Sequence, residues 1–510
     1  MVRTGEKGVA LVFTLFLMAA LSAMAVSMMF LAQTETSASR NYKTMSQARY
    51  AGEAGVHRVL HYLSSTAYTS LVTSVASLDT SVTPVTYSGN PVVLAPIATN
   101  SNHPSTTIKN AYAALFSGAS LSVGGNGATV AYTATATLIA ARLVNVYGGS
   151  PQVVETWRID ATGIVPGTLP ATVEVAAMLE RNSAPAETYA IFATGTGCGA
   201  LTMTGSAETN GFDYTAYATA NAGNPSPPPP TPDGQGGSVG TNGNLTIGGQ
   251  VDIHGNLDTP RTGVGNCNNG NITALTMTGG ANVSGDRIQL PQAKTYPTPD
   301  PPSPTPPTTS LTITTSTTCL SLVIPIGAFC TGSGGNFTIT TNGQTISWGN
   351  VSMGSGTSLT FNAGPGQSAA KINVNSFAMQ SGTTLNIADG TYLTMNAMGA
   401  SLGTNTPVID MTAGSLVNGT GVNAYDASKF QILYGGTATV KVGGSTDTAA
   451  TIYAPNARVE MGGTADFYGS VLSATYYTNG GTGVYYDRSL GQKYSTLGQH
   501  VMPSFSWQKY

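Results

Sequence analysis

Few residues of this chain are of the types that do chemistry. Its 510 residues include five histidines and four cysteines. The cysteines form no C-x-x-C pair, which argues against a zinc site. In an exported protein they are expected to form disulfides. Of the three pairings that four cysteines allow, closeness in sequence favours the third with the fourth and the first with the second. In chain order they are Cys198, Cys267, Cys319 and Cys330.

No group of residues resembles a catalytic or cofactor-binding motif. The chain contains no P-loop and no H-E-x-x-H sequence. His57 and His61 are four residues apart, the spacing of a metal pair on a helix, but no carboxylate or cysteine motif accompanies them. Several aspartates are scattered through the second half, and each is expected at a turn or on the surface. They are Asp252, Asp410, Asp447, Asp466 and Asp487. We predict no catalytic residue, no metal and no cofactor, with calcium at an aspartate-lined turn left open.

The composition indicates a folded, turn-rich β protein. Only 8% of the residues are charged, against roughly 25% in soluble globular proteins. Because 41% of the residues are hydrophobic, the chain can still form a core, and the low charge does not indicate disorder. The length predicts two or three domains. A net charge of −3 gives no attraction to nucleic acid, which we exclude as a partner.

An uncharged apolar segment near the N-terminus indicates in which cellular compartment the rest of the chain lies. Residues 8–32 contain no charge and exceed the roughly 20 residues needed to cross a membrane. Arg3 and Lys7 precede the segment, which predicts a cytoplasmic N-terminus and places everything after residue 35 outside the inner membrane. The alternative is a cleaved signal peptide, for which Ala23-Met24-Ala25 supplies a cleavage site.

A helical pattern continues beyond this segment and argues against a signal peptide. Small and apolar residues recur at three- and four-residue steps from Met45 to Leu63, as on one face of a helix. No proline occurs before Pro84. The sequence therefore predicts one helix over residues 9–64, about 80 Å long at 1.5 Å per residue. Residues 9–32 are its membrane-spanning part.

The start of this helix resembles the leader and cleavage site of a prepilin. The segment is Lys7-Gly8 followed by Val9-Ala10-Leu11-Val12. The resemblance implies a leader over residues 1–8, which a prepilin peptidase would cut between Gly8 and Val9.

A second stretch resembles PilX-type minor pilins. Residues 48–56, ARYAGEAGV, are similar to the A-x-Y-A-A-E-A-G-L sequence of that family, with Gly52 in place of alanine and Val56 in place of leucine. Major pilins carry a glutamate at the fifth mature position, where this chain has Phe13. In the family that glutamate pairs with the N-terminal amine of a neighbouring subunit, since a buried charge needs a partner. Its absence implies a priming or tip position in the filament.

Residues 65–186 are expected to form an α+β head on the helix. From Thr129 onward, apolar and polar residues alternate in three or four strands, separated by turns such as Pro166-Gly167. The pattern predicts an antiparallel meander with Trp157 in its core. A long helix carrying an antiparallel sheet is the architecture that the resemblance to pilins implies.

An internal repeat dominates the rest of the chain. In each copy apolar residues alternate over a short strand, a glycine follows, and a second short strand begins. The copies of the first unit are 201–211, 245–255, 275–285 and 459–469, and those of a second unit are 351–361 and 377–387. Each unit is too small to bury its own apolar face. We therefore predict that stacked units form an all-β domain, a β-solenoid, over residues 187–490.

Other features of this region bear on its architecture. Proline-rich stretches near residues 224–237 and 296–310 are expected to be extended loops, and residues 491–510 a tail. A β-sandwich is the alternative, because Asn-Gly and Asp-Gly pairs do occur, though not at even spacing. Three segments resemble the carboxy-terminal solenoid modules of PilX-like proteins: Ile452–Ala457, Phe467–Val471 and Tyr485–Asp487.

Aromatic residues are frequent near the C-terminus. We expect most of them to stack inside the domain, and the alternative is a sugar- or surface-binding patch. They are Phe467, Tyr468, Tyr476, Tyr477, Tyr485, Tyr486 and Trp507.

These features together predict a non-enzymatic minor subunit at the tip of a type IV pilus. Its expected partners are other pilins through the helix, the prepilin peptidase, the inner membrane before assembly, and a host surface, abiotic surface or glycan after assembly on the cell surface. Three alternatives stay open: an ordinary single-pass anchor, a tip pseudopilin of a type II-like secretion system, and a membrane-anchored or secreted solenoid that binds or cleaves polysaccharide.

Overall fold

The chain folds into two compact units. We call the first the head; it comprises residues 1–144, 152–182 and 497–510. We call the second the body; it comprises residues 145–151 and 183–496, so it is inserted in the sequence between two parts of the head. The computed structural model describes residues 7–71, 77–123, 128–144, 146, 152–167, 170–260, 275–277, 280–444, 446–493 and 495–509.

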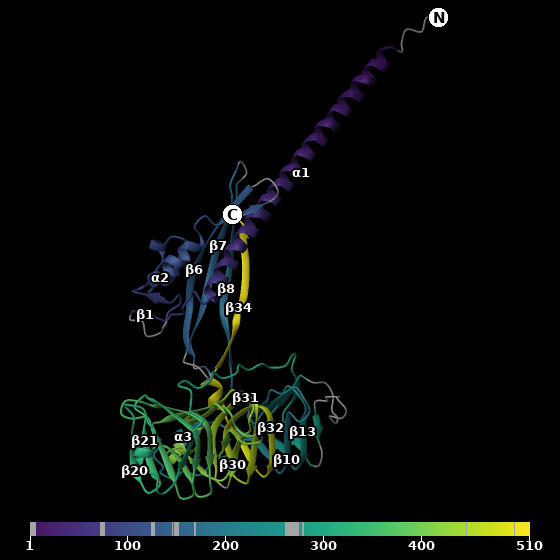
Figure 1. Ribbon diagram of the computed structural model, residues 1–510. Coiled ribbons are helices and arrows are strands. Elements are labelled where there is room, and N and C mark those ends of the chain that lie inside the picture. The colour runs from purple at the N-terminus through teal and green to yellow at the C-terminus, as the bar shows by residue number, and fades with distance from the viewer. Residues whose placement is uncertain are drawn as a thin grey trace. The chain divides into compact units, whose positions relative to one another are not determined.

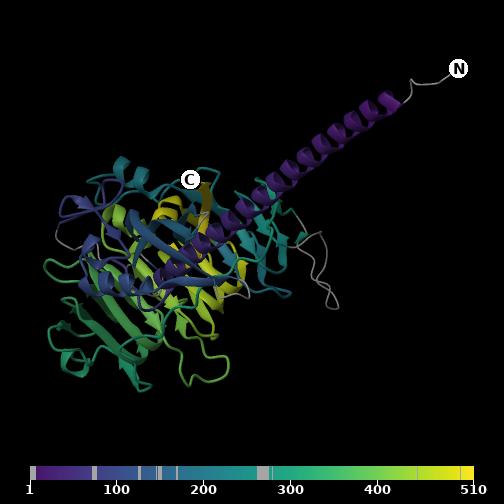
Figure 2. The same cartoon turned by 90° about the horizontal axis from the view of Figure 1, so that it is seen from above.

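The first element is a single helix, α1 (Lys7–Ser64), of 58 residues. Figures 1 and 2 show it unbroken along its length. The helix predicted over residues 9–64 is therefore confirmed, and it has no break near residue 33, where a cleaved or separately folded segment would begin. Within the described residues, α1 is the one helix that is long and apolar enough to cross a membrane, with a mean hydropathy of 2.5 over its most apolar window.

Two hydroxyl groups in the apolar half of α1 donate to carbonyl groups of the same helix. Thr14 Oγ1 donates to the carbonyl of Ala10 at 3.0 Å, and Ser27 Oγ donates to the carbonyl of Ala23 at 2.9 Å. These side chains can therefore enter an apolar medium without leaving a donor unpaired.

The head contains a sheet of six strands in the order β34-β8-β7-β6-β4, with β5 pairing β6. Its strands are β4 (Val93–Leu94), β5 (Ser120–Val123), β6 (Ala128–Val144), β7 (Gln152–Val165), β8 (Ala171–Pro185) and β34 (Ser495–Lys509). Strands β5 to β8 pair antiparallel in sequence order, which confirms the predicted meander. Trp157 is buried in this unit, as predicted. The smaller elements are β1 (Leu78–Asp79), β2 (Thr86–Tyr87), β3 (Asn90–Pro91), η1 (Ala98–Asn100) and α2 (Thr106–Leu115).

The last residues of the chain are not the tail that was expected over 491–510. Strand β34 lies beside β8 at the edge of the head sheet, where Figure 1 draws it in yellow. Pro503 is compatible with this position because an edge strand leaves one row of N–H groups without a neighbour in the sheet. Strands β8 and β34 are therefore neighbours in space although the body separates them in sequence.

The body is built from short strands and a few helical turns. Its first strands are β9 (Ile191–Ala193), β10 (Leu201–Gly205), β11 (Glu208–Phe212), β12 (Val239–Thr241), β13 (Leu245–Gly249), β14 (Asp252–Ile253), β15 (Leu257–Thr259), β16 (Leu275–Met277), β17 (Asn282–Val283) and β18 (Arg287–Gln289). The later strands are β19 (Ser310–Ile313), β20 (Phe329–Ser333), β21 (Asn336–Thr340), β22 (Thr345–Met353), β23 (Ser358–Asn362), β24 (Ala369–Met379), β25 (Thr384–Ile387), β26 (Tyr392–Ala397), β27 (Ile409–Asp410), β28 (Ser415–Val417), β29 (Phe430–Tyr434), β30 (Val440–Gly444), β31 (Thr448–Gly463), β32 (Phe467–Gly480) and β33 (Gly483–Asp487). The helical turns are α3 (Tyr214–Ala220), η2 (Cys319–Ser321), η3 (Gly421–Tyr425), η4 (Ala427–Lys429) and η5 (Arg488–Gln492).

These strands form a parallel stack. Among the described strands of the body, β20 and β21 form the one antiparallel pair, and the others pair in parallel, as β10 does with β13 and β22 with β24. A β-sandwich built from hairpins would need antiparallel neighbours throughout. That alternative is therefore wrong, and the predicted architecture of a long helix, an antiparallel sheet and a mostly-β C-terminal region is confirmed at this level.

The order of strands in the stack differs from their order in the chain. Strand β9 lies between β32 and β12, so the chain enters the stack in its interior. Strands β10 to β18 extend the stack in one direction. Strands β19 to β33 form the other part, which ends with β32 against β9 and β10. In Figure 1 the yellow strands β31 and β32 accordingly lie beside the teal strands β10 and β13.

The repeat copies occupy equivalent places in this stack. The first residues of three copies are register partners on β10, β13 and β16: Leu201, Leu245 and Leu275. The fourth copy begins at Val459 on β31, which is separated from β10 by strand β32. Tyr476 of β32 is the register partner of both Val459 and Leu201. The starts of the second unit, Val351 and Phe377, are also register partners. The copies therefore stack in register, and their apolar residues face one interior.

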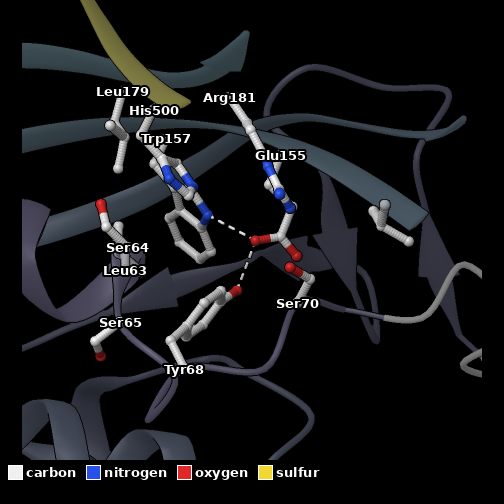
Figure 3. Close-up of a pocket in the computed structure, with 11 residues that line it drawn as sticks. Leu63, Ser64, Ser65, Tyr68, Ser70, Glu155, Trp157, Leu179, Arg181 and His500 are labelled. Carbon is white, nitrogen blue, oxygen red and sulfur yellow. Dashed lines mark hydrogen bonds between the residues drawn. The ribbon is translucent and has the colours of Figure 1, made fainter. Parts of the chain in front are cut away.

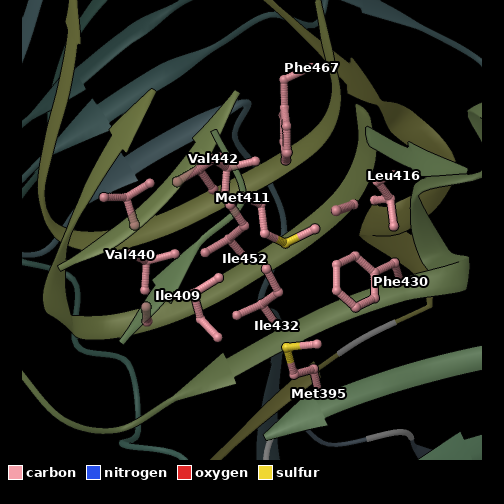
Figure 4. Close-up of a cluster of buried hydrophobic side chains, with 14 of the residues drawn as sticks. Met395, Ile409, Met411, Leu416, Phe430, Ile432, Val440, Val442, Ile452 and Phe467 are labelled. Carbon is pink, nitrogen blue, oxygen red and sulfur yellow. The ribbon is translucent and has the colours of Figure 1, made fainter. Parts of the chain in front are cut away.

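Figure 4 shows part of this interior. Met395, Ile432 and Ile452 are successive register partners on β26, β29 and β31, and all three are buried. Burying a side chain of this size contributes roughly 1.5–3 kcal/mol. The alternating pattern read from the sequence thus supplies a continuous apolar core along the stack.

The proline-rich stretch near 296–310 runs along the stack and joins β18 to β19. Its carbonyl groups accept hydrogen bonds from side chains on several strands. The pairs are Tyr453 OH with Pro297 O (2.9 Å), Asn373 Nδ2 with Pro304 O (2.8 Å) and Asn350 Nδ2 with Thr308 O (2.8 Å). Just before the stretch, Asn242 Nδ2 donates to the carbonyl of Lys294 at 2.7 Å. Because proline has no N–H, asparagine and tyrosine donors suit such a segment. The stretch near 224–237 is also a loop, as predicted.

A disulfide joins Cys319 and Cys330, whose Cα atoms are 5.5 Å apart. This is one of the two pairs that closeness in sequence suggested. Cys198 is also disulfide-bonded, and Cys267 lies outside the described residues. No cysteine among the described residues is free.

Most of the C-terminal aromatic residues are interior. Those with buried side chains are Phe467, Tyr468, Tyr476 and Tyr486. Tyr477 and Tyr485 are partly exposed, and the side chain of Trp507 lies outside the described ones. Stacking inside the body is therefore confirmed for these four residues, and they form no surface patch.

Candidate functional site

The N-terminal half of α1 is an unpartnered apolar surface. Every large apolar side chain from Val9 to Leu31 is more than half exposed. No charged residue lies between Lys7 and Glu35. An exposed apolar surface of this extent requires lipid or protein around it. This half of the helix can therefore span a membrane or pack among helices of the same kind.

The C-terminal half of α1 packs on the head sheet through a face of small residues. Buried positions on this face recur every three or four residues: Ala48, Gly52, Gly55, Val59 and Leu63. A Cβ on Gly52 would lie 2.7 Å from Val175 Cγ2, and a Cβ on Gly55 would lie 3.2 Å from Ala161 Cβ. The PilX-like stretch 48–56 therefore allows the helix to approach the sheet closely.

The sheet meets this helix face with a glycine of its own. Gly163 lies near the end of β7, paired with Tyr132 on β6 and Val173 on β8. A Cβ on Gly163 would overlap the carbonyl oxygen of Ala48 and lie 2.6 Å from the amide nitrogen of Gly52. The backbones of α1 and β7 are therefore in direct contact, which no larger residue at position 163 permits.

The opposite face of the same stretch is polar and exposed. Arg49 Nε lies 2.8 Å from Glu53 Oε1, an ion pair one helical turn long whose partly exposed charges contribute little to stability. His57 and His61 are both exposed. No group of three or more metal-binding side chains occurs in the part of the chain that the structure describes. Gly8 and Val9 lie in the first turn of α1, and residues 1–6 of the expected leader are outside the described residues.

A cavity of about 540 Å³ opens in the head beside the end of α1. Figure 3 shows Glu155 at its centre, with Arg181 and His500 among the lining residues. The Glu155 carboxylate accepts hydrogen bonds from Tyr68 OH at 2.7 Å, Trp157 Nε1 at 2.9 Å and the Leu71 amide at 2.5 Å.

The electrostatics of this cavity favour neutral side chains. Burial raises the pKa of Glu155, and the three donors oppose that rise. Burial and then Arg181 lower the pKa of His500. The hydrogen bonds of Glu155 connect the segment that follows α1 to β7. The polar groups of this cavity therefore have a structural role in the head. The sequence did not single out Glu155, because its partners are up to 87 residues away.

The stability of the head is expected to fall with rising pH because of Glu155. Since the folded state holds the proton more tightly than the unfolded chain, its stabilising contribution is complete below the unfolded pKa of about 4.3 and is lost as the pH rises through the higher folded pKa. The free energy of unfolding should fall by at most about 1.4 kcal/mol per pH unit in that interval. Denaturant titrations of wild type and Glu155→Gln between pH 4 and 8 measure the difference in slope. Glu174→Gln on β8 is the matched control, and an unchanged slope in Glu155→Gln would contradict the prediction.

Acidic residues that look scattered in the sequence form one column on the body. Following the register, the column runs through Asp447, Asp466, Gly483, Glu208, Asp252 and Asn282 on successive strands. Four of these six positions are the eighth residue of a repeat copy, a signal that the sequence already contained. The expectation of scattered acids is therefore wrong for Asp252, Asp447 and Asp466. Asp252 and Asp466 point outward, because the residues on either side of each are buried, and Asp447 is itself exposed.

The column has structural roles in the described residues. Asp447 Oδ1 accepts from the Asp466 amide at 3.1 Å, and Asp466 Oδ1 accepts from the Gly483 amide at 3.2 Å. Burial raises the pKa of Asp466, and the neighbouring carboxylates add to this rise. The remaining two aspartates are turn residues, as predicted: Asp410 and Asp487 accept from residues two positions on.

Comparison with known proteins identifies two segments of the chain. Residues 7–57 match the PilX N-terminal family, and residues 330–493 match a domain family of unknown function, DUF7305. No curated protein matches the chain. The crystal structure of the competence-associated pilin ComZ from Thermus thermophilus is similar at 15% identity, covering 92% of this chain and 98% of that chain, with a TM-score of 0.27. A TM-score this low does not establish a shared fold.

The PilX match confirms the resemblance seen in the sequence. It covers the apolar half of α1 and the small-residue stretch 48–56 that packs on the head sheet. The chain therefore carries the N-terminal segment of a type IV pilin-like minor subunit.

Proposed function

We propose that this chain, with its PilX-type N-terminal segment, is a minor subunit at the tip of a type IV pilus. A prepilin peptidase would cut it between Gly8 and Val9, and the exposed half of α1 would then move from the inner membrane into the filament core. The chain would act by assembly and contact, without catalytic turnover.

The single observation that carries this proposal is the continuity of α1. One helix joins an exposed apolar half to a half that is packed on the head. A filament of such subunits buries the apolar halves against each other and leaves the heads outside. A cleaved signal peptide would need neither the continuous helix nor the small-residue face.

The tip position is supported by Phe13. A glutamate at this place in a repeating subunit needs a charged partner in the filament core. Phe13 is exposed on α1 and carries no charge. A subunit without the glutamate can start a filament without a neighbour that supplies the partner.

The body is the part that we propose is displayed for contact. We infer that its parallel stack is the β-solenoid expected from the repeats. Solenoids present extended surfaces on which each strand adds one row of side chains. Such a domain suits adhesion to a host surface, an abiotic surface or a glycan.

N-terminal sequencing of the chain recovered from sheared surface filaments tests the proposal. The expected first residue is Val9. Gly8→Leu should leave the leader attached, whereas Gly5→Leu, the matched control in the same leader, should be cut normally. A mature start at Val26 would show signal-peptidase cleavage and exclude a pilin. Recovery of the protein from the periplasm alone, with secretion lost on deletion and pili intact, would favour the secretion pseudopilin.

A further inference from the structure

A loop at one end of the body displays aliphatic side chains to solvent. Strand β19 is the last of its column, since β22 is the one described strand with which it is in register. The chain after β19 closes on itself through the disulfide between Cys319 and Cys330. We call residues 319–330 the apolar loop. In this loop Leu320 and Ile326 are 99% exposed and Val323 is 75% exposed.

The apolar loop is held in shape by several contacts. Leu322 is 2% exposed and belongs to the core of the body, and Ile324 packs against that core. Trp348 Nε1 donates to the carbonyl of Val323 at 2.6 Å. Inward and outward side chains therefore alternate, and the disulfide closes the base of the loop. A preformed loop loses little conformational entropy on binding.

The stretch of chain that contains the loop carries no charge. From residue 301 to residue 370 the chain has no Asp, Glu, Lys, Arg or His. Attraction to anionic lipid, nucleic acid or a charged peptide needs such residues. The remaining driving force is the burial of apolar surface.

The chemistry of the loop fits lipid better than a protein partner. Energetically dominant residues of protein interfaces are enriched in Trp, Tyr and Arg, whereas Leu and Val are under-represented. The three most exposed large apolar side chains of the loop are all aliphatic, and the one aromatic residue, Phe329, is less exposed at 47%. Backbone polar groups are costly in an apolar medium, and several here are already paired. The amides of Ser321, Leu322 and Ala328 bond to carbonyls within or next to the loop, at 2.9, 3.2 and 3.2 Å.

We propose that the apolar loop is a membrane-contact site that inserts Leu320, Val323 and Ile326 among the acyl chains of an uncharged lipid surface. It deepens the proposed function by naming the contact surface of the body and the class of its target. Its test does not require a filament, so the two proposals can fail separately.

Vesicle flotation of the purified full chain tests the loop. Amphipol holds α1, and the vesicles are phosphatidylcholine. The variant Leu320→Ser, Val323→Ser, Ile326→Ser should reduce the bound fraction about tenfold, because three apolar side chains no longer enter the lipid. The matched control replaces three exposed apolar residues elsewhere in the body, Ile288→Ser, Tyr392→Ser and Val417→Ser. Its binding should stay within about twofold of wild type.

The outcomes separate the alternatives. Any transfer of α1 to the vesicles is common to all three proteins, so the difference between them reports the loop. Adding phosphatidylglycerol should not increase the loop-dependent binding. Equal binding of the loop variant and wild type overturns the proposal in favour of a protein partner. Binding that requires phosphatidylglycerol also overturns it, because the attraction is then one of charge.

Discussion

Replacing Gly163 by alanine is expected to destabilise the head by about 3 kcal/mol, because the new Cβ would overlap the α1 backbone at Ala48. Neither backbone can move without breaking hydrogen bonds of its own element, so α1 must lift from β7. The stability of a domain is only about 5–15 kcal/mol. We therefore expect the second half of α1 to lose its protection in the head.

Hydrogen exchange of the full chain in detergent, over a denaturant series, measures this effect. Peptides of β6, β7 and β8 report the head, and peptides of β22 and β24 report the body as an internal reference. Protection in the body should be unchanged, because Gly163 belongs to the other compact unit. Unchanged protection of the head in Gly163→Ala would contradict the close contact between α1 and β7.

Gly55→Ala is the matched control for this prediction. Its Cβ would lie 3.2 Å from Ala161 Cβ, a contact that a shift of a few tenths of an ångström between the helix and the strand relieves. Alanine is also favoured over glycine inside a helix by about 1 kcal/mol. The two terms oppose each other, and the change in head stability should stay within about 1 kcal/mol. The same substitution is thus expected to have a large effect on one side of the interface and a small effect on the other.

Replacing Ile191 by lysine is expected to unfold the body as a whole. Ile191 is fully buried on β9, with Val471 of β32 on one side and Val239 of β12 on the other. An ammonium group placed there has no partner, and a cost above about 4 kcal/mol follows. Because β9 joins the two parts of the stack, the loss should reach strands on both sides.

Hydrogen exchange of peptides from β13 and β24 distinguishes global from local loss. We expect both peptides to lose protection together in Ile191→Lys. Ile288→Lys is the matched control, since Ile288 is 39% exposed and lies on β18, at one end of the stack. That variant should keep wild-type protection in β24. Loss confined to β13 in Ile191→Lys would show that the two parts of the stack fold separately.

Local features of the chain were readable from the sequence. The apolar run and the three- and four-residue steps up to Leu63 predicted α1, because a helix places residues at that spacing on one face regardless of the rest of the fold. The repeat spacing predicted which residues share a strand position, and the structure places Leu201, Leu245 and Leu275 in register. The pairing of Cys319 with Cys330 followed from their short separation.

The acidic column was predictable from the repeat. Asp252 and Asp466 are both the eighth residue of their copies, so stacking in register was enough to bring such residues to one face. Distance along the chain does not indicate this column, because its acids lie far apart in sequence. Partners of Glu155 were not predictable in this way, since no repeat relates β7 to the segment after α1.

The sequence by itself determined the elements and their inward faces: one continuous helix, an antiparallel meander and repeated short strands. Only the tertiary structure decided which strands are neighbours, as with β34 beside β8 and β9 between β32 and β12. Strands pair through backbone N–H and C=O groups, and every residue except proline carries both. The sequences of strands with the same alternation therefore do not show which strand pairs with which. The tertiary structure also decided that Leu320 and Ile326 face solvent, because their exposure depends on where the stack ends.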